Sequence, residues 1–279
     1  MKKTILRVAL LSCAAVAVGP AMANHSWNDY HWSKSGTKLE LDVLKAISSP
    51  WITSVNGAIN DWNQSSVVSL TGQNASGVNT KKCSPIAGKI LVCDASYGNR
   101  GWLGIATIWL SNGHISQATT KLNNSYFNTS TYNTPAWRSL VACQEIAHDF
   151  GLDHQDEGFG PPNLGTCMDY TNDPDGGGAY GPSNEHPNSH DYAQIETVYS
   201  HTHASATNFG VREVGKAAPQ ANVPNEAPAG DSPAEWGRPV SRDGLGRPDV
   251  YVKDIAPGRK MITHVFWAIG EGPRGGQQD

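Results

Sequence analysis

Apolar residues recur at helical spacing near the start of the chain, in the stretch "SSPWITSVNGAINDWNQS". One face of a helix drawn through this stretch carries Trp51, Val55, Ile59 and Trp62. Ser49 and Pro50 come just before it, as an N-cap residue and a proline at the first helical position do. We therefore predict an amphipathic helix that packs on a sheet.

Short runs of branched and aromatic residues, separated by Gly and Asn, predict four strands. The runs cover residues 67–70, 89–93, 103–110 and 114–122. A second helix is predicted over 136–150, because Thr134 and Pro135 form a start signal and Gly151 is placed to end the helix in the left-handed conformation. Helices among strands in this order indicate an α+β fold with a small mixed twisted sheet.

The remainder of the chain divides by composition. Residues 152–187 are rich in Gly, Pro, Asn and Asp and predict irregular loop. A third helix is predicted over 189–200, with Tyr192, Ile195 and Tyr199 as its buried stripe. Residues 205–235 are rich in Pro, Ala and Gly, which is typical of a linker. Residues 236–279 alternate well enough for a short β-rich segment, whose role stays open.

The first 23 residues have the pattern of a secretory signal peptide. A basic start and an apolar run precede Ala21-Met22-Ala23, so cleavage is expected before Asn24. Lipidation at Cys13 is the alternative, but Leu11 fits a lipobox badly. No later stretch offers the roughly 18 consecutive apolar residues of a membrane span. We expect a protein secreted to the extracellular space or the periplasm, with residues 24–204 as its main domain.

Charge and cysteine content narrow the class of partner. The net charge of -4 becomes -7 when Lys2, Lys3 and Arg7 leave with the signal peptide, since -4 - 3 = -7. This argues against nucleic acid or an anionic membrane as a partner, and we expect a monomer. Four cysteines remain, and of the three possible pairings we favour Cys83 with Cys93 and Cys143 with Cys167. A four-cysteine metal site is the alternative, but the wide spacing disfavours it.

A metal-binding pattern lies in the second helix and the turn that follows it, "CQEIAHDFGLDH". Gln144 and His148 are four residues apart and share a helix face, with Glu145 beside them. After the turn at Gly151, His154 can return to the same point. Three ligands with one further position for water are what a catalytic zinc ion needs, and Glu145 is placed to take a proton from that water.

These residues resemble the HExxHxxGxxH motif of the metzincin metallopeptidases at every fixed position except the first, and Met168 in "GTCMDY" resembles the Met-turn of that family. The resemblance covers residues 27–203 and is closest to secreted bacterial matrixin-like peptidases. It implies an upper subdomain with the sheet and two helices, and an irregular lower subdomain that ends in a helix. It also implies a peptide or protein as substrate.

The resemblance implies a role for each matched residue. His148 and His154 bind zinc, Glu145 is the general base, and Met168 lies beneath the metal. Tyr170 stands where some metzincins place a tyrosine that binds zinc or steadies the oxyanion, and a packed loop tyrosine is the alternative. The strand at 114–122 is expected to pair with an extended substrate.

Gln144 departs from the family pattern. Its carbonyl oxygen is a poorer zinc ligand than an imidazole nitrogen. Three accounts remain open: Gln144 binds zinc directly, another group such as Tyr170 or Asp156 completes the site, or the protein is an inactive relative. Because Glu145 and both histidines are retained, a zinc-dependent endopeptidase is our leading hypothesis. A secreted protein that binds peptides without cleaving them is the alternative.

Two further signals are interpreted as structural. Asp173 and Asp175 in "NDPDGGG" suggest a calcium loop, but the spacing and closing Glu of an EF-hand are absent, so we favour a turn-rich loop over a Ca²⁺ site. Several other histidines are interpreted as surface or capping residues rather than as a second metal site. They are His25, His31, His114, His186, His190, His201 and His203.

Overall fold

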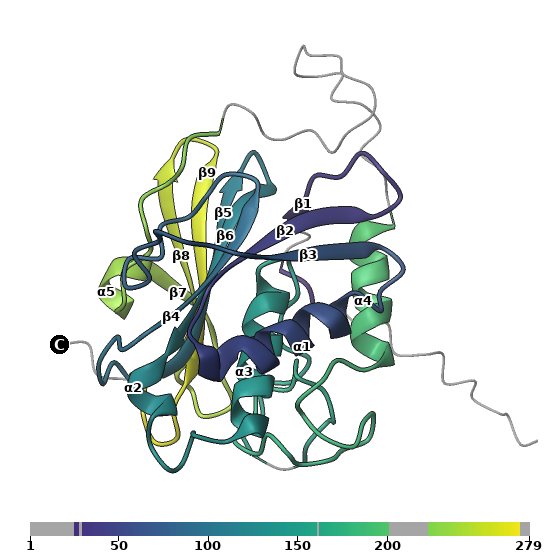
Figure 1. Ribbon diagram of the computed structural model, residues 1–279, viewed down its shortest axis with the longest axis vertical. Coiled ribbons are helices and arrows are strands. Elements are labelled where there is room, and N and C mark those ends of the chain that lie inside the picture. Colours follow the sequence, from purple (N-terminus) through teal and green to yellow (C-terminus); the bar gives the residue numbers. More distant parts are fainter. Residues whose placement is uncertain (1–24, 28–29, 161, 201–222, 274–279) are drawn as a thin grey trace, which may run out of the picture.

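The computed structural model describes residues 25–27, 30–160, 162–200 and 223–273. The predicted signal peptide, residues 1–23, lies outside the described residues. Within them, the chain is an α+β fold built on one large sheet, with its longer helices on one side of the sheet (Figure 1). No helix in the described ranges is long and apolar enough to cross a membrane.

The sheet contains nine strands in the order β3-β2-β4-β6-β5-β9-β8-β7, with β1 paired to β6 off this path. The strands are β1 His31–Trp32, β2 Leu39–Ala46, β3 Val68–Asn74, β4 Lys89–Ala95, β5 Trp102–Ser111, β6 His114–Asn123, β7 Arg238–Arg242, β8 Pro248–Ala256 and β9 Arg259–Trp267. Strands β3, β2, β4 and β6 run parallel, and every pairing from β6 through β5 to β7 is antiparallel.

The helices hold the metal-binding pattern against this sheet. They are the 3-10 turn Ser49–Trp51, α1 Ile52–Trp62, α2 Asn124–Phe127, α3 Pro135–His148, α4 Ser189–Tyr199 and α5 Pro233–Trp236. Helix α1 packs against α3, where the Trp62 Nε1 donates to the Cys143 carbonyl at 3.1 Å. Helix α3 in turn packs on β5, so its last turn is held over the middle of the sheet.

The predicted strands and helices are confirmed, with small shifts at their ends. Thr134 caps α3 by accepting from the Trp137 amide, and Asn188 caps α4 through a capping box with Asp191. The expected cap at Ser49 is wrong: Ser48 is the N-cap, and its hydroxyl donates to Asp94 instead of the helix. Strands β1 and β2 were not predicted, although "LELDVLKA" in β2 alternates as a half-buried strand does.

The expectation of a small sheet is wrong, because the C-terminal residues extend it. Strand β9 pairs with the outer edge of β5 from Trp102 to Ser111, and β8 and β7 follow. Almost all of β5 is buried, so an uncovered edge there would expose backbone groups of a very apolar strand. Residues 236–279, whose role the sequence left open, therefore supply three strands of the same sheet.

The linker expectation is also wrong for the described residues 223–235. The buried Lys121 donates to the Ala229 carbonyl at 2.7 Å, and Gln117 donates to the Pro224 carbonyl at 3.1 Å. The Trp102 Nε1 donates to the Asp231 carbonyl at 3.0 Å. This segment is therefore bound to side chains of β5 and β6 instead of spanning solvent.

The strand expected to bind substrate is an interior strand. Strand β6, which covers the predicted 114–122, pairs with β4 on one side and with β5 on the other. Its backbone is already used, so the prediction that it pairs with an extended peptide is wrong. Strand β5, the antiparallel neighbour of β6, pairs with β9 on its other side, so the backbone of β5 is occupied as well.

Both predicted disulfides are present, Cys83–Cys93 and Cys143–Cys167. The second joins α3 to the loop that carries Met168, next to Gln144. It therefore fixes the part of α3 around Gln144 against the loop that carries Met168.

Gly151 is required where α3 ends. Its φ is +102°, and a Cβ atom there would lie 2.3 Å from the Tyr30 carbonyl oxygen. Gly113 also has a positive φ, +85°, but a Cβ there would meet nothing within 4 Å. We expect Gly113→Ala to cost about 1–2 kcal/mol of unfolding free energy through backbone strain, and Gly151→Ala to cost more because the clash adds to the strain. Urea denaturation measures both, and equal losses would contradict the close approach.

Candidate metal centre

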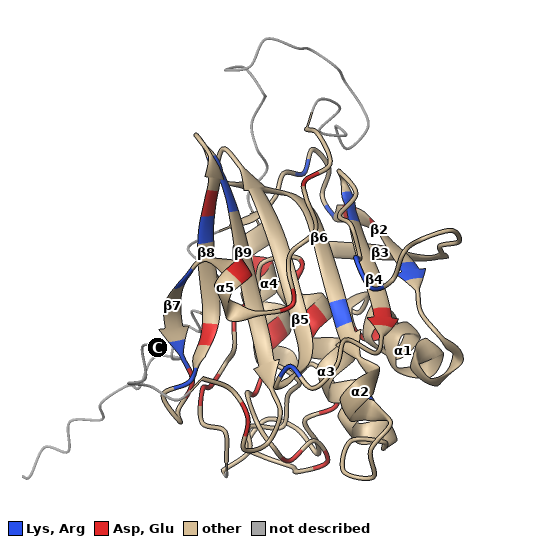
Figure 2. Cartoon of the chain, turned by 90° about the vertical axis from the view of Figure 1, so that its left-hand side faces the viewer, with Lys and Arg blue, Asp and Glu red and all other residues tan. Residues whose placement is uncertain are grey.

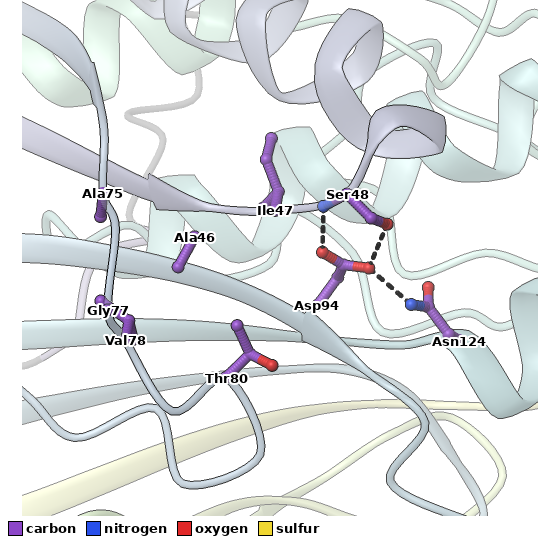
Figure 3. Close-up of a pocket in the computed structure, with 9 residues that line it drawn as sticks. All are labelled: Ala46, Ile47, Ser48, Ala75, Gly77, Val78, Thr80, Asp94 and Asn124. Atoms are coloured by element: carbon purple, nitrogen blue, oxygen red, sulfur yellow. Dashed lines mark hydrogen bonds between the residues drawn. The ribbon is translucent and has the colours of Figure 1, made fainter.

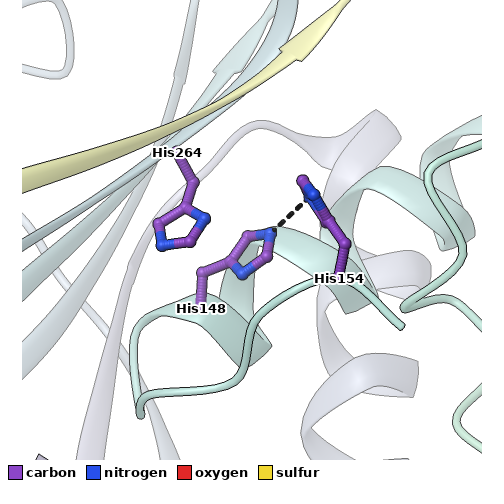
Figure 4. A group of neighbouring side chains, drawn as sticks. All are labelled: His148, His154 and His264. Atoms are coloured by element: carbon purple, nitrogen blue, oxygen red, sulfur yellow. Dashed lines mark hydrogen bonds between the residues drawn. The ribbon is translucent and has the colours of Figure 1, made fainter. Parts of the chain in front are cut away.

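Three buried histidines converge between α3 and the sheet (Figure 4). His148 is the last residue of α3, His154 follows the turn at Gly151, and His264 lies on β9. One ring nitrogen of each lies within 4.8 Å of the others. Residues 110 positions apart thus meet at one point because β9 pairs with β5 next to α3.

The rings of His148 and His154 are held in the tautomer that a metal ion requires. The His148 Nδ1 lies 2.8 Å from the Leu152 carbonyl oxygen, and the His154 Nδ1 lies 3.0 Å from Glu157 Oε1. A carbonyl or carboxylate oxygen accepts, so each Nδ1 carries a proton, and in the neutral form of either ring Nε2 keeps the lone pair that a metal ion would use. The two Nε2 atoms face each other at 3.1 Å. Two lone pairs at this distance need a proton or a cation between them.

His264 completes the group. It is 1% exposed, and neither ring nitrogen has a hydrogen-bond partner among the described residues. Asp153 Oδ1 is 4.0 Å from its Nδ1, too far for a hydrogen bond. The ring stacks on His148 with centroids 4.0 Å apart. A buried imidazole without a partner is costly, and a metal ion would satisfy it. Three imidazoles are a donor set that suits Zn²⁺, so these residues fit the ion.

Two carboxylates support His154 from behind. Glu157 accepts from its Nδ1, and Asp249 Oδ2 on β8 lies 3.7 Å from the same atom. Burial lowers the pKa of His154, but Glu157 and Asp249 outweigh it, so the pKa is raised well above its usual value. Burial raises the pKa of Glu157 to about 7, although His154 opposes the shift. A carboxylate behind a ligating histidine orients the ring and makes it a stronger ligand.

The other two rings are neutral. Burial lowers the pKa of His148 and of His264 well below the usual value, and the neighbouring imidazoles lower both further. Neutral imidazole is the form that binds metal ions. The centre therefore consists of two neutral rings and one, His154, whose carboxylate partners favour a proton when no cation is bound.

Glu145 lies between α3 and β5. Gly104 on β5 makes room for it, since a Cβ there would lie 2.7 Å from Glu145 Oε1. The Ala106 backbone amide hydrogen-bonds the carboxylate, and Oε2 has no hydrogen-bond partner in the described part of the chain. Burial raises the pKa of Glu145 well above its usual value. A buried carboxyl with one oxygen unused and a raised pKa is typical of a group that exchanges a proton.

Gln144 contacts the loop around Met168. Its Nε2 donates to the Cys167 carbonyl at 2.8 Å and to the Asp169 carbonyl at 3.1 Å. Its Oε1 is buried and has no hydrogen-bond partner among the described atoms. The amide thus holds the loop on both sides of the buried Met168. The prediction that Gln144 binds the metal stays a prediction.

Tyr170 contacts β9. Its hydroxyl donates to the Val265 carbonyl at 3.3 Å and accepts from the Trp267 amide at 3.0 Å. Its ring packs beside His154 with centroids 4.7 Å apart. Burial raises the pKa of Tyr170 well above its usual value, so the hydroxyl stays protonated. In this arrangement the hydroxyl holds β9 in place, which favours the packed tyrosine over the oxyanion role.

The segment that carries His148 and His154 is acidic in sequence. The chain has no Lys or Arg between Arg138 and Arg212, whereas acidic residues are frequent there. In Figure 2 the stretches of backbone coloured for Asp and Glu lie on α3 and along the loops below the sheet. Asp173, one of the two residues considered for calcium, accepts from Asn163 Nδ2 at 2.7 Å. Neither Asp173 nor Asp175 belongs to a cluster of three metal-ligating side chains within the described residues.

A separate hollow of about 450 Å³ lies between the β2 end and the loop after β3 (Figure 3). Its one acid, Asp94, accepts from the Ser48 amide at 2.5 Å, from the Ser48 hydroxyl at 2.6 Å and from Asn124 at 2.5 Å. Because these bonds already use both carboxylate oxygens, we assign no chemistry to this hollow.

Comparison with known proteins gives no relative: no family model matches the sequence, and no curated protein matches it. The site therefore rests on its own geometry. Sequence reasoning found Gln144, Glu145, His148, His154 and Tyr170, which the fold brings to one region. It missed His264 and Asp249, which lie far away in sequence. The available signal was a histidine inside the run "MITHVFWA", which is apolar apart from Thr263 and His264.

Removing His264 tests whether it is a ligand. Loss of a group that only supports a metal ligand typically weakens metal binding by about tenfold or more. Because a ligand contributes at least as much, we expect His264→Ala to weaken zinc binding at least about tenfold. Isothermal titration calorimetry of the metal-free protein with Zn²⁺ measures the change. His186→Ala, at an exposed ring paired with Asp61, is the matched control and should leave affinity unchanged. Unchanged affinity in His264→Ala would instead favour Gln144 as the third ligand.

Proposed function

We propose that this chain is a secreted, zinc-dependent endopeptidase of the metzincin type. We propose further that the conformation described here is a closed form, in which a substrate cannot reach the metal centre. The observation that carries the proposal is the pair of facing Nε2 atoms of His148 and His154, with Glu145 on the same helix as His148. The QExxHxxGxxH spacing and Met168 support the same reading. The two disulfides fit the oxidising compartment that a signal peptide would lead to.

In this proposal His148, His154 and His264 hold the ion in the closed form. Bound zinc would supply Lewis-acid polarisation of the scissile carbonyl and would make a nearby water more acidic. Glu145 would accept a proton from the attacking water through its unused Oε2 and pass it to the leaving amine, while the hydroxide adds to the scissile carbonyl carbon and the C–N bond breaks. Its buried position, with Oε2 unpaired among the described residues, suits a group that takes up and passes on a proton. Gly104 and the Ala106 amide fix the carboxylate in place.

The closed form has no room for a peptide substrate. All three imidazoles are buried. Strand β9 pairs with the edge of β5 to which an extended peptide substrate would otherwise add. We propose that β9 occupies the position of the substrate strand and must separate from β5 before cleavage. When His264 leaves with β9, the buried Oε1 of Gln144 is the group on α3 that can take its place.

A non-catalytic zinc protein on the same fold is the second candidate. The observation in its favour is that His264 makes a three-imidazole centre without Gln144 and shields it fully from solvent. Such a centre would stabilise the junction between β9 and α3. Dependence of peptide cleavage on Glu145 separates the two candidates.

Replacement of Glu145 tests the chemistry. We expect Glu145→Gln to abolish cleavage of a fluorogenic casein peptide while zinc content stays the same, because the amide cannot accept the proton. Glu40→Gln, an exposed change of the same kind on β2, is the control and should retain activity. Addition of a chelator should stop cleavage by the wild-type protein. Full activity in Glu145→Gln would exclude Glu145 as the general base.

Tyr170→Phe tests the closed form. Losing the hydroxyl removes two bonds to the β9 backbone, so we expect faster peptide cleavage and a loss of about 1–2 kcal/mol of unfolding free energy. Tyr199→Phe is matched, because the Tyr199 hydroxyl also donates to a carbonyl, that of Phe150, and accepts from an amide, that of Trp32. It should lower stability without raising activity. Slower cleavage in Tyr170→Phe alone would instead assign Tyr170 to the oxyanion.

A further inference from the structure

A second cluster of metal-ligating side chains lies apart from the three central histidines. His25 comes from the first described residues, and His190 and Asp191 from the first turn of α4. One ligand atom of each lies within 4.8 Å of the others. His25 is 5% exposed and Asp191 0%, so the interpretation of His25 as a surface residue is wrong. His190 is half-buried, which leaves the cluster within reach of solvent.

Two atoms that face each other in this cluster, His25 Nε2 and Asp191 Oδ1, are acceptors. The His25 Nδ1 lies 3.0 Å from the Asp153 carbonyl oxygen, so it carries the proton and leaves a lone pair on Nε2. That Nε2 lies 3.7 Å from Asp191 Oδ1. Neither atom has a hydrogen-bond partner among the described residues, and neither does the His190 Nδ1. Unpartnered buried polar atoms are rare, and here three meet at one place.

The surrounding contacts hold these ligands in position. Asp191 Oδ2 accepts from the Thr166 hydroxyl and from the Asn188 amide, which leaves Oδ1 for the cluster. The His25 ring is held by the Asp153 carbonyl and packs parallel to the His190 ring, with centroids 5.0 Å apart. Supporting bonds behind each ligand are typical of a built metal site.

We propose that His25 Nε2, His190 and Asp191 Oδ1 form a second zinc site, with a structural role. Two imidazoles and a carboxylate are donors that Zn²⁺ accepts, and solvent at His190 can supply a fourth ligand. The ion would clamp residues 25–27 to α4. The same segment already bonds the loop between His148 and His154, since the Asp153 amide donates to the His25 carbonyl at 2.6 Å and the Trp27 amide donates to the Gly151 carbonyl at 3.3 Å. The second ion therefore stabilises the loop that positions the central site.

Zinc content per chain tests this site separately from the central one. Metal-free full-length protein is dialysed against buffered Zn²⁺ and analysed by mass spectrometry of the metal. We expect two zinc ions in wild type and in the His186→Ala control, one in His190→Ala, one in His148→Ala and none in the double variant. His190 is preferred to Asp191 for replacement, because Asp191 also caps α4. Circular dichroism establishes that each variant is folded.

The outcomes separate the two proposals. Suppose that wild type binds one zinc ion, which His190→Ala retains and His148→Ala loses. This result would overturn the second site and leave the proposed function standing. One zinc that only His190→Ala loses would support the second site and contradict the central one. Two zinc ions in a folded His190→Ala variant would show that His190 does not hold the second ion, and would overturn the proposal.

Discussion

The backbone pairing of β9 with β5 is the contact on which the candidate site depends. It runs from Trp102 to Ser111 and brings His264 beside His148. It also places the backbone of Val265 and Trp267 on the Tyr170 hydroxyl and, through β8, brings Asp249 behind His154. Without this pairing, β5 would be an open, apolar edge, and the centre would keep only the groups from α3 and its following loop.

The same pairing explains a costly arrangement. His264 is buried with no hydrogen bond to either ring nitrogen among the described residues, and the Nε2 atoms of His148 and His154 face each other. A chain that only needed to close the sheet would place an apolar residue at position 264, as it does at Ile262 and Phe266. An imidazole there loses the hydration of its ring nitrogens, and no hydrogen bond within the described residues replaces it, whereas a bound cation would. The burial of these groups is thus the best physical argument for a metal centre.

Local signals predicted the α3 half of the site, and long-range pairing decided the rest. The Thr134 cap, the four-residue spacing of Gln144 and His148, and the turn at Gly151 are properties of one continuous segment, and the structure has them as expected. His264 joins the site because β9 pairs with β5, although it lies 110 residues after His154 in the sequence. No local pattern specifies which edge of the sheet a strand near the end of the chain will pair with. For the same reason the sequence predicts too small a sheet and assigns the substrate-binding role to β6. Gln144 could be recognised as a departure, but its bonds to the Cys167 and Asp169 carbonyls required the fold.

The central claim is that the C-terminal strand supplies the third ligand. Anomalous diffraction at the zinc edge from crystals of the zinc-loaded protein tests it most directly. The account predicts a peak about 2.0–2.1 Å from a ring nitrogen of each of His148, His154 and His264, the usual zinc to imidazole distance. A peak bound by His148, His154 and the Oε1 of Gln144, with His264 beyond bonding distance, would contradict it, as would the absence of a peak between these rings.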